Sequence, residues 1–137
     1  MADRPVLHTA AVGISWRTAS AELRDRCHVP PERHREILAA LHEDGVEEVL
    51  LLSTCNRVEF WMAASDPERA VEAATARWEA LCAPGPDWRR FLNTRFHDQA
   101  VQHVFRVASS VDSIVPGETQ IPAQVLSSWR ESRDAGC

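Results

Sequence analysis

The chain has 137 residues, a formal net charge of −5 and 45% hydrophobic residues, which is typical of one compact domain with its own core. Its apolar runs are shorter than the ~18 residues of a membrane-spanning helix, and the start lacks a secretory apolar region, so we expect a cytoplasmic protein without membrane contact. No G-x-G-x-x-G occurs among the five glycines and every basic side chain is Arg, which excludes dinucleotide binding through that motif and Schiff-base catalysis by lysine.

In chain order, apolar patterns predict a strand over 6–14, a helix over 32–43, and a hairpin of strands 46–53 and 58–63 joined by loop 54–57. The helix follows a Pro-Pro pair, which suits its first turn. The first hairpin strand contains a continuous apolar run, so we expect both of its faces to be covered. The second hairpin strand alternates in character, and the short loop favours an antiparallel pair.

The second half predicts a capped helix over 67–82, a weak strand over 94–97, a helix over 98–109 and a last helix from about 120 to 133. In the helix predicted over 98–109, Asp98 is the expected N-cap. The apolar stripe expected to face the core contains Val101, Val104, Phe105 and Ala108. The whole order predicts an α+β fold, with helices packed on one small antiparallel sheet.

Cys55 lies in the hairpin loop, two residues before Arg57. A neighbouring guanidinium and the amides of a tight turn favour a thiolate, which is the nucleophilic form of cysteine. The alternative is a small buried hydrophobe that caps the hairpin. The spacing of the remaining His and Cys residues does not suggest a metal site.

His103 is expected on the side of its helix opposite the apolar stripe, so it either meets solvent or lines a site. Gln120 and Gln124 lie one turn apart at the start of the last helix, where free backbone amides can receive an anion. The alternative for this segment is an ordinary polar helix start.

Three segments combine these patterns: VGISWRTAS near the start, LLSTCNRVEF in the hairpin, and AVQHVFRVASSVDSIVPGETQIPAQV near the end. Together they resemble the N-terminal catalytic domain of glutamyl-tRNA reductase, over residues 6–136. The resemblance implies a ferredoxin-like fold, in which helices pack on an antiparallel sheet. The chain departs from the family pattern at Trp16, where the family commonly carries His.

The resemblance implies that Cys55 attacks the ester between glutamate and the 3′ end of tRNA and forms a glutamyl thioester. It places His103 in the active site as a second catalytic residue. Arg57 is expected to hold a carboxylate of glutamate through its planar guanidinium. The substrate-binding residues that the resemblance implies are Thr54, Asn56, Arg57, Ser113, Glu118, Thr119, Gln120 and Gln124.

In the family this domain is followed by an NADPH-binding domain and a helical dimerisation domain, and the resemblance assigns residues 1–137 to the catalytic domain alone. We therefore expect no cofactor on this chain, with NADP needed only by a separate or missing reductase domain. That domain would reduce the thioester to glutamate-1-semialdehyde for tetrapyrrole (porphyrin) biosynthesis. The expected partner is charged tRNA, in the first place glutamyl-tRNA.

Three functions remain open from the sequence. The first possibility is the catalytic part of a glutamyl-tRNA reductase, able to perform only the thioester-forming half reaction. Alternatively, the chain is a free-standing acyltransferase or thioesterase that passes an aminoacyl group from Cys55 to water, an amine, a thiol, or a reductase or acceptor protein. The third possibility is a non-catalytic module that binds charged tRNA or a partner enzyme.

Overall fold

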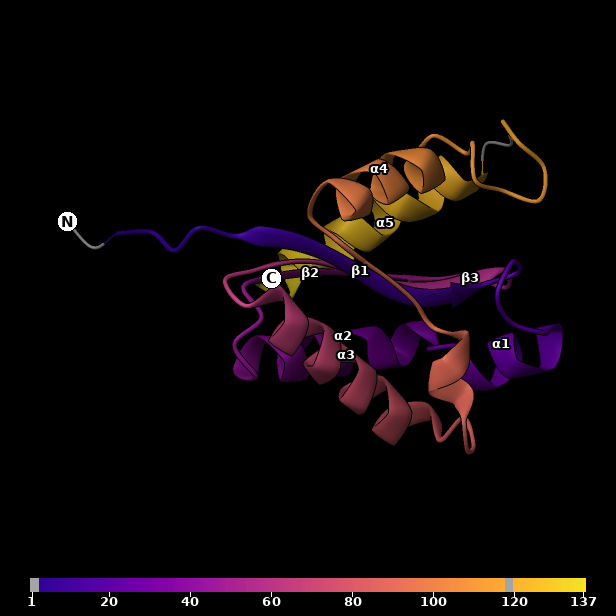
Figure 1. Ribbon diagram of the computed structural model, residues 1–137, viewed down its shortest axis with the longest axis horizontal. Coiled ribbons are helices and arrows are strands. Elements are labelled where there is room, and N and C mark those ends of the chain that lie inside the picture. The colour runs from indigo at the N-terminus through magenta and orange to yellow at the C-terminus, as the bar shows by residue number, and fades with distance from the viewer. Residues whose placement is uncertain (1–2, 118–119) are drawn as a thin grey trace.

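The computed structural model describes residues 3–117 and 120–137, in which a four-stranded antiparallel sheet lies between two layers of helices (Figure 1). The strands are ordered β2-β3-β1-β4 across the sheet. Their bounds are Glu48–Ser53 for β2, Arg57–Ala64 for β3, His8–Ser15 for β1 and Asn93–Phe96 for β4. This order and the β-α-β-β-α-β connection are those of a ferredoxin-like sheet, which confirms the predicted α+β class.

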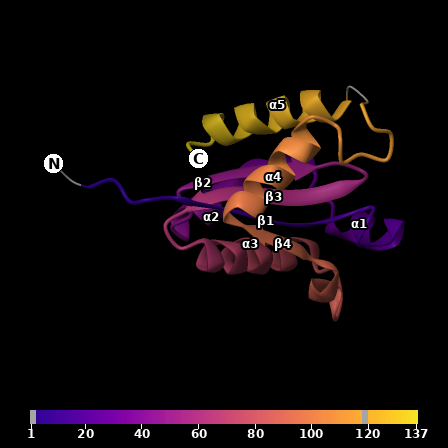
Figure 2. The ribbon, with the colours of Figure 1, turned by 45° about the horizontal axis from the view of Figure 1, so that its top comes forward.

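Three helices cover one face of the sheet and two cover the other. The first group contains α1 (Ala21–Cys27), α2 (Pro31–Glu43) and α3 (Pro67–Cys82). The second contains α4 (His97–Ala108) and α5 (Gln120–Asp134), which lie together above the sheet in Figure 1. In Figure 2, with the top turned forward, α4 crosses in front of the sheet and α5 lies above it. The two-sided cover explains why the strands carry apolar residues on both faces.

The predicted hairpin, the weak strand and the helices that correspond to α2, α3, α4 and α5 are present within about two residues of their expected bounds. Helix α1 and a short 3₁₀ helix at Trp88–Phe91 were not predicted. Helix α1 has only seven residues, too few for a clear apolar period, although Ser20 caps it by accepting a hydrogen bond from the Leu23 amide.

Strand β3 shows how the two layers divide the sheet. Val58, Phe60 and Met62 belong to the core beneath α1–α3, whereas Trp61 packs in the smaller cluster beneath α4 and α5. Alternating side chains reach opposite faces of a strand, so the same strand supplies both cores. The odd-numbered positions of β3 therefore face the layer in which the polar site described below is built.

Helix α4 corrects two expectations. It begins at His97 without a side-chain cap, so Asp98 is not its N-cap. Its fully buried residues are Ala100 and Val107, whereas Val101 and Phe105 are 38% and 70% exposed. Val104 of the expected stripe packs against the smaller core cluster, whereas Val101 and Phe105 line an open groove beside α5. Hydropathy located an apolar stripe but not the line of contact.

Candidate active site

Cys55 lies at the tip of the turn between β2 and β3, and the turn is held by its neighbours. The Thr54 hydroxyl accepts hydrogen bonds from the amides of Asn56 and Arg57, each at 3.2 Å. The Asn56 carbonyl accepts from the Trp16 amide at 2.8 Å, which ties the turn to the end of β1. These bonds fix the backbone and leave Cys55 exposed. The hydrophobic-cap alternative is therefore wrong for this cysteine.

The other three cysteines have environments that suppress the thiolate. Burial, followed by the neighbouring Cys82, raises the pKa of Cys27 to about 12, against a smaller lowering by Arg26. Burial also raises the pKa of Cys82 and of Cys137. Cys55 is thus the exposed thiol of the chain, and all four cysteines are free.

A cavity of about 230 Å³ surrounds the Cys55 turn. It brings together seven of the residues that sequence reasoning proposed, namely Thr54, Cys55, Asn56, Arg57, Ser113, Gln120 and Gln124. Trp16, Ile114, Val115 and Ile121 complete its wall. Glu118 and Thr119, which were also proposed, lie outside the described residues. Residues from three distant segments therefore converge on one thiol.

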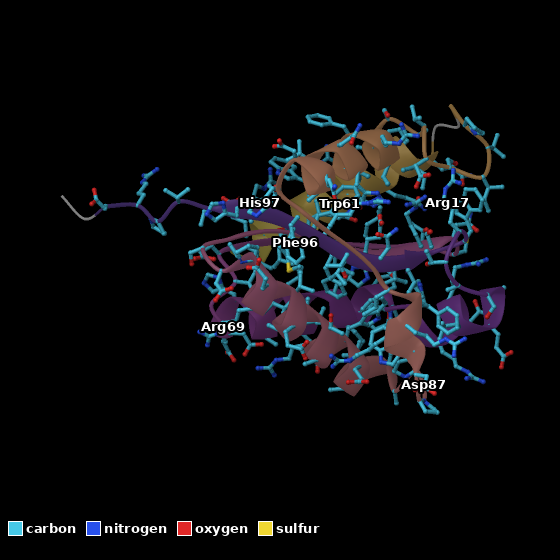
Figure 3. The ribbon with its side chains drawn as sticks, viewed as in Figure 1. Arg17, Trp61, Arg69, Asp87, Phe96 and His97 are labelled. Atoms are coloured by element: carbon cyan, nitrogen blue, oxygen red, sulfur yellow. The ribbon has the colours of Figure 1, made fainter. Side chains whose placement is uncertain are left out.

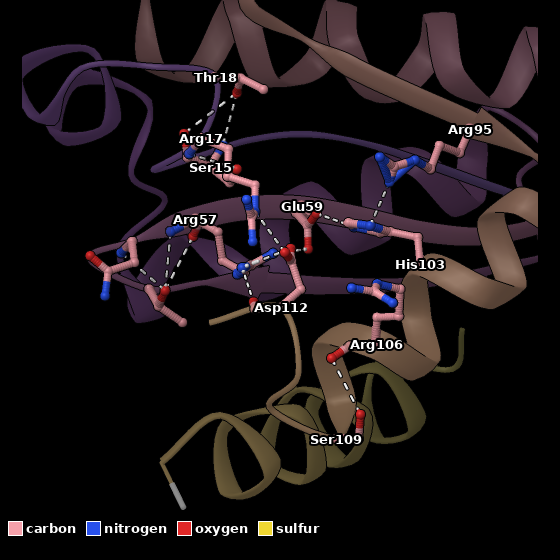
Figure 4. Close-up of polar contacts among 12 residues, drawn as sticks. Ser15, Arg17, Thr18, Arg57, Glu59, Arg95, His103, Arg106, Ser109 and Asp112 are labelled. Carbon is pink, nitrogen blue, oxygen red and sulfur yellow. Dashed lines mark hydrogen bonds and ion pairs between the residues drawn. The ribbon is translucent and has the colours of Figure 1, made fainter. Parts of the chain in front are cut away.

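Beneath this cavity lies a buried network of charges that connects the turn after β1, strand β3 and the segment after α4 (Figure 4). Arg57 is only 1% exposed, and its terminal nitrogens pair with Glu59 at 3.4 Å and with Asp112 at 3.3 Å. Asp112 also accepts from Arg17 Nε at 2.7 Å. Two carboxylates thus hold the guanidinium of Arg57, and its Nε has no hydrogen-bond partner among the described residues.

The pKa of Asp112 lies below its usual value. Burial alone would raise it, but the hydrogen bond from Arg17 and the charges of Arg57 and Arg17 outweigh that effect. Asp112 is therefore ionised in the folded protein near neutral pH. Its charge compensates the buried guanidinium, which would otherwise be costly to bury.

His103 is nearly buried and faces the sheet, with its side chain 11% exposed, so the prediction that it points away from the packed side of its helix is wrong. Arg95 donates to His103 Nδ1 at 2.7 Å, and His103 Nε2 lies 2.5 Å from a Glu59 oxygen. Because a guanidinium has no acceptor, Nδ1 must accept the hydrogen bond from Arg95. Nε2 must then carry the ring hydrogen and donate it in a hydrogen bond to Glu59. Both ring nitrogens are therefore engaged.

The structure does not bring His103 into the cavity of Cys55. It lines a second cavity of about 680 Å³ on the same side of the sheet, beyond the pair of Arg57 and Glu59. The link between the two proposed catalytic residues is thus indirect and runs through these two charged side chains. The catalytic role of His103 stays a prediction.

Glu59, Asp112 and Arg17 were not predicted as site residues. Arg24 donates to the Cys55 carbonyl at 3.3 Å and so helps to hold the turn. The sequence held one clue to the close packing around Glu59, which is the glycine at position 13 within a strand. Gly13 pairs with Glu59 across β1 and β3. A Cβ on Gly13 would lie 2.7 Å from Glu59 Cγ and 2.3 Å from the Val58 carbonyl oxygen, so only glycine leaves room there.

Within residues 3–117 and 120–137, no three or more His, Cys, Asp or Glu side chains cluster so that they could hold a metal ion. Within the same segments, no helix has the length and apolar character needed to cross a membrane.

Comparisons with known proteins agree on one family. Residues 12–137 match the family model described as "Glutamyl-tRNAGlu reductase, N-terminal domain". A glutamyl-tRNA reductase from Synechococcus sp. (strain RCC307) is 39% identical over 132 residues, which cover 93% of this chain and 29% of the relative. One from Synechocystis sp. is 38% identical over 121 residues, and the match covers 28% of that relative.

Among solved structures, glutamyl-tRNA reductase from Methanopyrus kandleri superposes with a TM-score of 0.68 at 26% sequence identity. The match covers 93% of this chain and 29% of that one. The chain thus spans less than a third of the length of the relatives that it matches.

Proposed function

Since the chain belongs to the family of glutamyl-tRNA reductase N-terminal domains, we propose that it captures the glutamyl group of charged tRNA as a thioester on Cys55. The observation that carries this proposal is the exposed thiol of Cys55 at the tip of a fixed turn, inside a cavity that also gathers polar side chains. Fixed backbone geometry lowers the cost of bringing a nucleophile to an ester.

In the proposed step the thiolate sulfur attacks the carbonyl carbon of the ester, a carbon–sulfur bond forms and the carbon–oxygen bond to the tRNA ribose breaks. The ribose oxygen leaves with the proton that the thiol gave up, so the products are a glutamyl thioester and uncharged tRNA. An aminoacyl ester is already activated toward a sulfur nucleophile, so the step needs positioning and a thiolate more than strong acid catalysis.

Arg57 lines the cavity but is 1% exposed, and its charge is paired with Glu59 and Asp112. Its Nε hydrogen is the unpartnered donor, because the terminal nitrogens already face Glu59 and Asp112. Because this atom is buried, we propose that the cavity-lining Gln120 and Gln124 donate amide hydrogen bonds to a substrate carboxylate, and that Arg57 holds the floor beneath them.

The proposal for these 137 residues covers formation of the thioester and not its reduction to an aldehyde. The relatives named glutamyl-tRNA reductase are more than three times as long as the segment matched here. The proposed contribution of the chain to tetrapyrrole biosynthesis is therefore the first half of that reaction.

The test is incubation of the protein with glutamyl-tRNA labelled in the glutamyl group. Wild type should retain label that survives denaturation and is released by base or hydroxylamine, and Cys55→Ser should retain none. Cys82→Ser is the matched control and should retain as much label as wild type. Cys82 itself should carry none, because it is half-buried and its pKa is raised. Wild type without label would contradict the catalytic proposal and favour a module that only binds charged tRNA.

A further inference from the structure

A second cavity adjoins the one that holds Cys55, and nothing in the proposed thioester step uses it. Its volume is about 680 Å³. The two cavities meet at the ion pair of Arg57 and Asp112, since Arg57 lines the first and Asp112 lines the second. The second cavity therefore lies on the other side of this ion pair from the cavity that Cys55 lines.

Polar side chains dominate the wall of this second cavity. Three arginines, Arg17, Arg95 and Arg106, face two carboxylates, Glu59 and Asp112. Amide and imidazole groups come from Asn93, Gln99, Gln102 and His103. On α4 the contributing residues recur at positions 99, 102, 103 and 106, which is the spacing of one helix face.

The two carboxylates are already satisfied within the protein. Glu59 accepts from His103 and Arg57, and Asp112 accepts from Arg17 and Arg57. Their charge is thus neutralised locally, and the surplus in and around the cavity is positive. This contrasts with the whole chain, whose formal net charge is −5.

Arg106 supplies the clearest free cation. It is exposed, and its guanidinium has no hydrogen bond or ion pair with the residues that the structure describes. In Figure 4 it extends from the same part of α4 as His103, and no dashed line reaches its guanidinium. An exposed arginine that faces a polar cavity without a carboxylate partner is suited to bind an anion.

We propose that this cavity binds a phosphate diester of the 3′ end of the charged tRNA, with Arg106 as its main phosphate contact. The inference rests on the proposed function, because it takes tRNA as the carrier of the acyl group. The phosphate of the terminal nucleotide is separated from the aminoacyl ester by a single ribose. The two cavities lie on the same side of the sheet, on either side of the pair of Arg57 and Asp112, and arginine with amide donors is a common phosphate-binding set.

The test compares Arg106→Gln with Arg130→Gln in the thioester assay at several salt concentrations. Arg130 is a matched control, because it is an exposed arginine on α5 that lines neither cavity. Arg106→Gln should raise the KM for glutamyl-tRNA roughly tenfold, with the rate at saturation retained. The slope of log KM against log salt should fall by about 0.7, the value for one phosphate contact on a single strand.

Arg106→Lys keeps the positive charge and should retain most of the salt slope, a rescue that a purely structural role would not give. The inference is overturned if Arg106→Gln has the KM and salt slope of wild type, or if Arg130→Gln changes both to the same extent. In either case labelled Cys55 in wild type would still support the proposed function. Absence of label in wild type would instead remove the proposed function itself.

Discussion

At the scale of single residues, the reactivity of the four thiols follows from their surroundings. Cys55 is exposed, whereas burial raises the pKa of Cys27, Cys82 and Cys137. We expect a thiol reagent such as DTNB at pH 8 to modify one cysteine in a fast phase, and Cys55→Ser to remove that phase alone. Cys27 should react only at the rate of unfolding. A fast phase that persists in Cys55→Ser would contradict this order.

Asp112 links acidity to stability. Its folded pKa is lowered, so its contribution is complete above the unfolded pKa of about 4 and is lost as the pH falls through the folded value. Asp112→Asn should lower the free energy of unfolding at pH 7 by about 3 kcal/mol, because Arg57 keeps a buried charge with one partner fewer. Urea unfolding of both proteins between pH 7 and 3 should show the difference shrinking below about pH 4. A constant difference would exclude this linkage.

The residues of the thiol turn could be predicted from the sequence because Thr54, Asn56 and Arg57 are close to Cys55 along the chain. The network beneath it could not. Arg57 and Asp112 are 55 positions apart, and Arg17 and Asp112 are 95 apart, so nothing local pairs them. The strand alternation gave no reason to bury Glu59. Its burial depends on His103 from a helix on the same side of the sheet.

At the scale of elements, the strands and long helices were predicted because their apolar periods are clear, whereas the orientation of α4 was not. That helix carries apolar residues on more than one face, and contact with the sheet buries Ala100 and Val107 while Val101 and Phe105 stay exposed. Period identifies a helix, but tertiary contacts decide which side is buried.

The orientation of α4 can be tested by two truncations. Val107→Ala removes two buried methyl groups and should lower the free energy of unfolding by about 2 kcal/mol. Phe105→Ala removes a larger side chain that is mostly exposed and should change it by less than about 0.5 kcal/mol. Chemical denaturation measures both. The reverse order would restore the stripe that hydropathy favoured.

At the scale of the whole molecule, the sheet separates a structural layer from a chemical one. Helices α1, α2 and α3 enclose the larger apolar core, and the charged network and both polar cavities lie on the side of α4 and α5. Figure 3 shows Trp61 and Arg17 on that upper side and Asp87 and Arg69 below. Substitutions in the lower layer should therefore affect stability more than substrate handling.

The proposed half reaction predicts how the chain behaves with a reductant. Given glutamyl-tRNA and NADPH, it should accumulate the Cys55 thioester without loss of absorbance at 340 nm and without semialdehyde. Adding a reductase domain from a longer relative should consume the thioester. Semialdehyde formed by this chain alone would contradict the assignment of hydride transfer to another domain.

The tryptophans offer an optical report on the site. The chain has five tryptophans and no tyrosine, so its ultraviolet emission comes from indole rings alone. Trp78 and Trp88 stack edge to face in the lower layer with ring centres 4.8 Å apart, whereas Trp16 lies in the wall around Cys55. Acylation of the thiol changes the polarity beside Trp16 and leaves the distant pair untouched. A shift in emission during loading, absent in Trp16→Phe, would follow thioester formation in real time without a radiolabel.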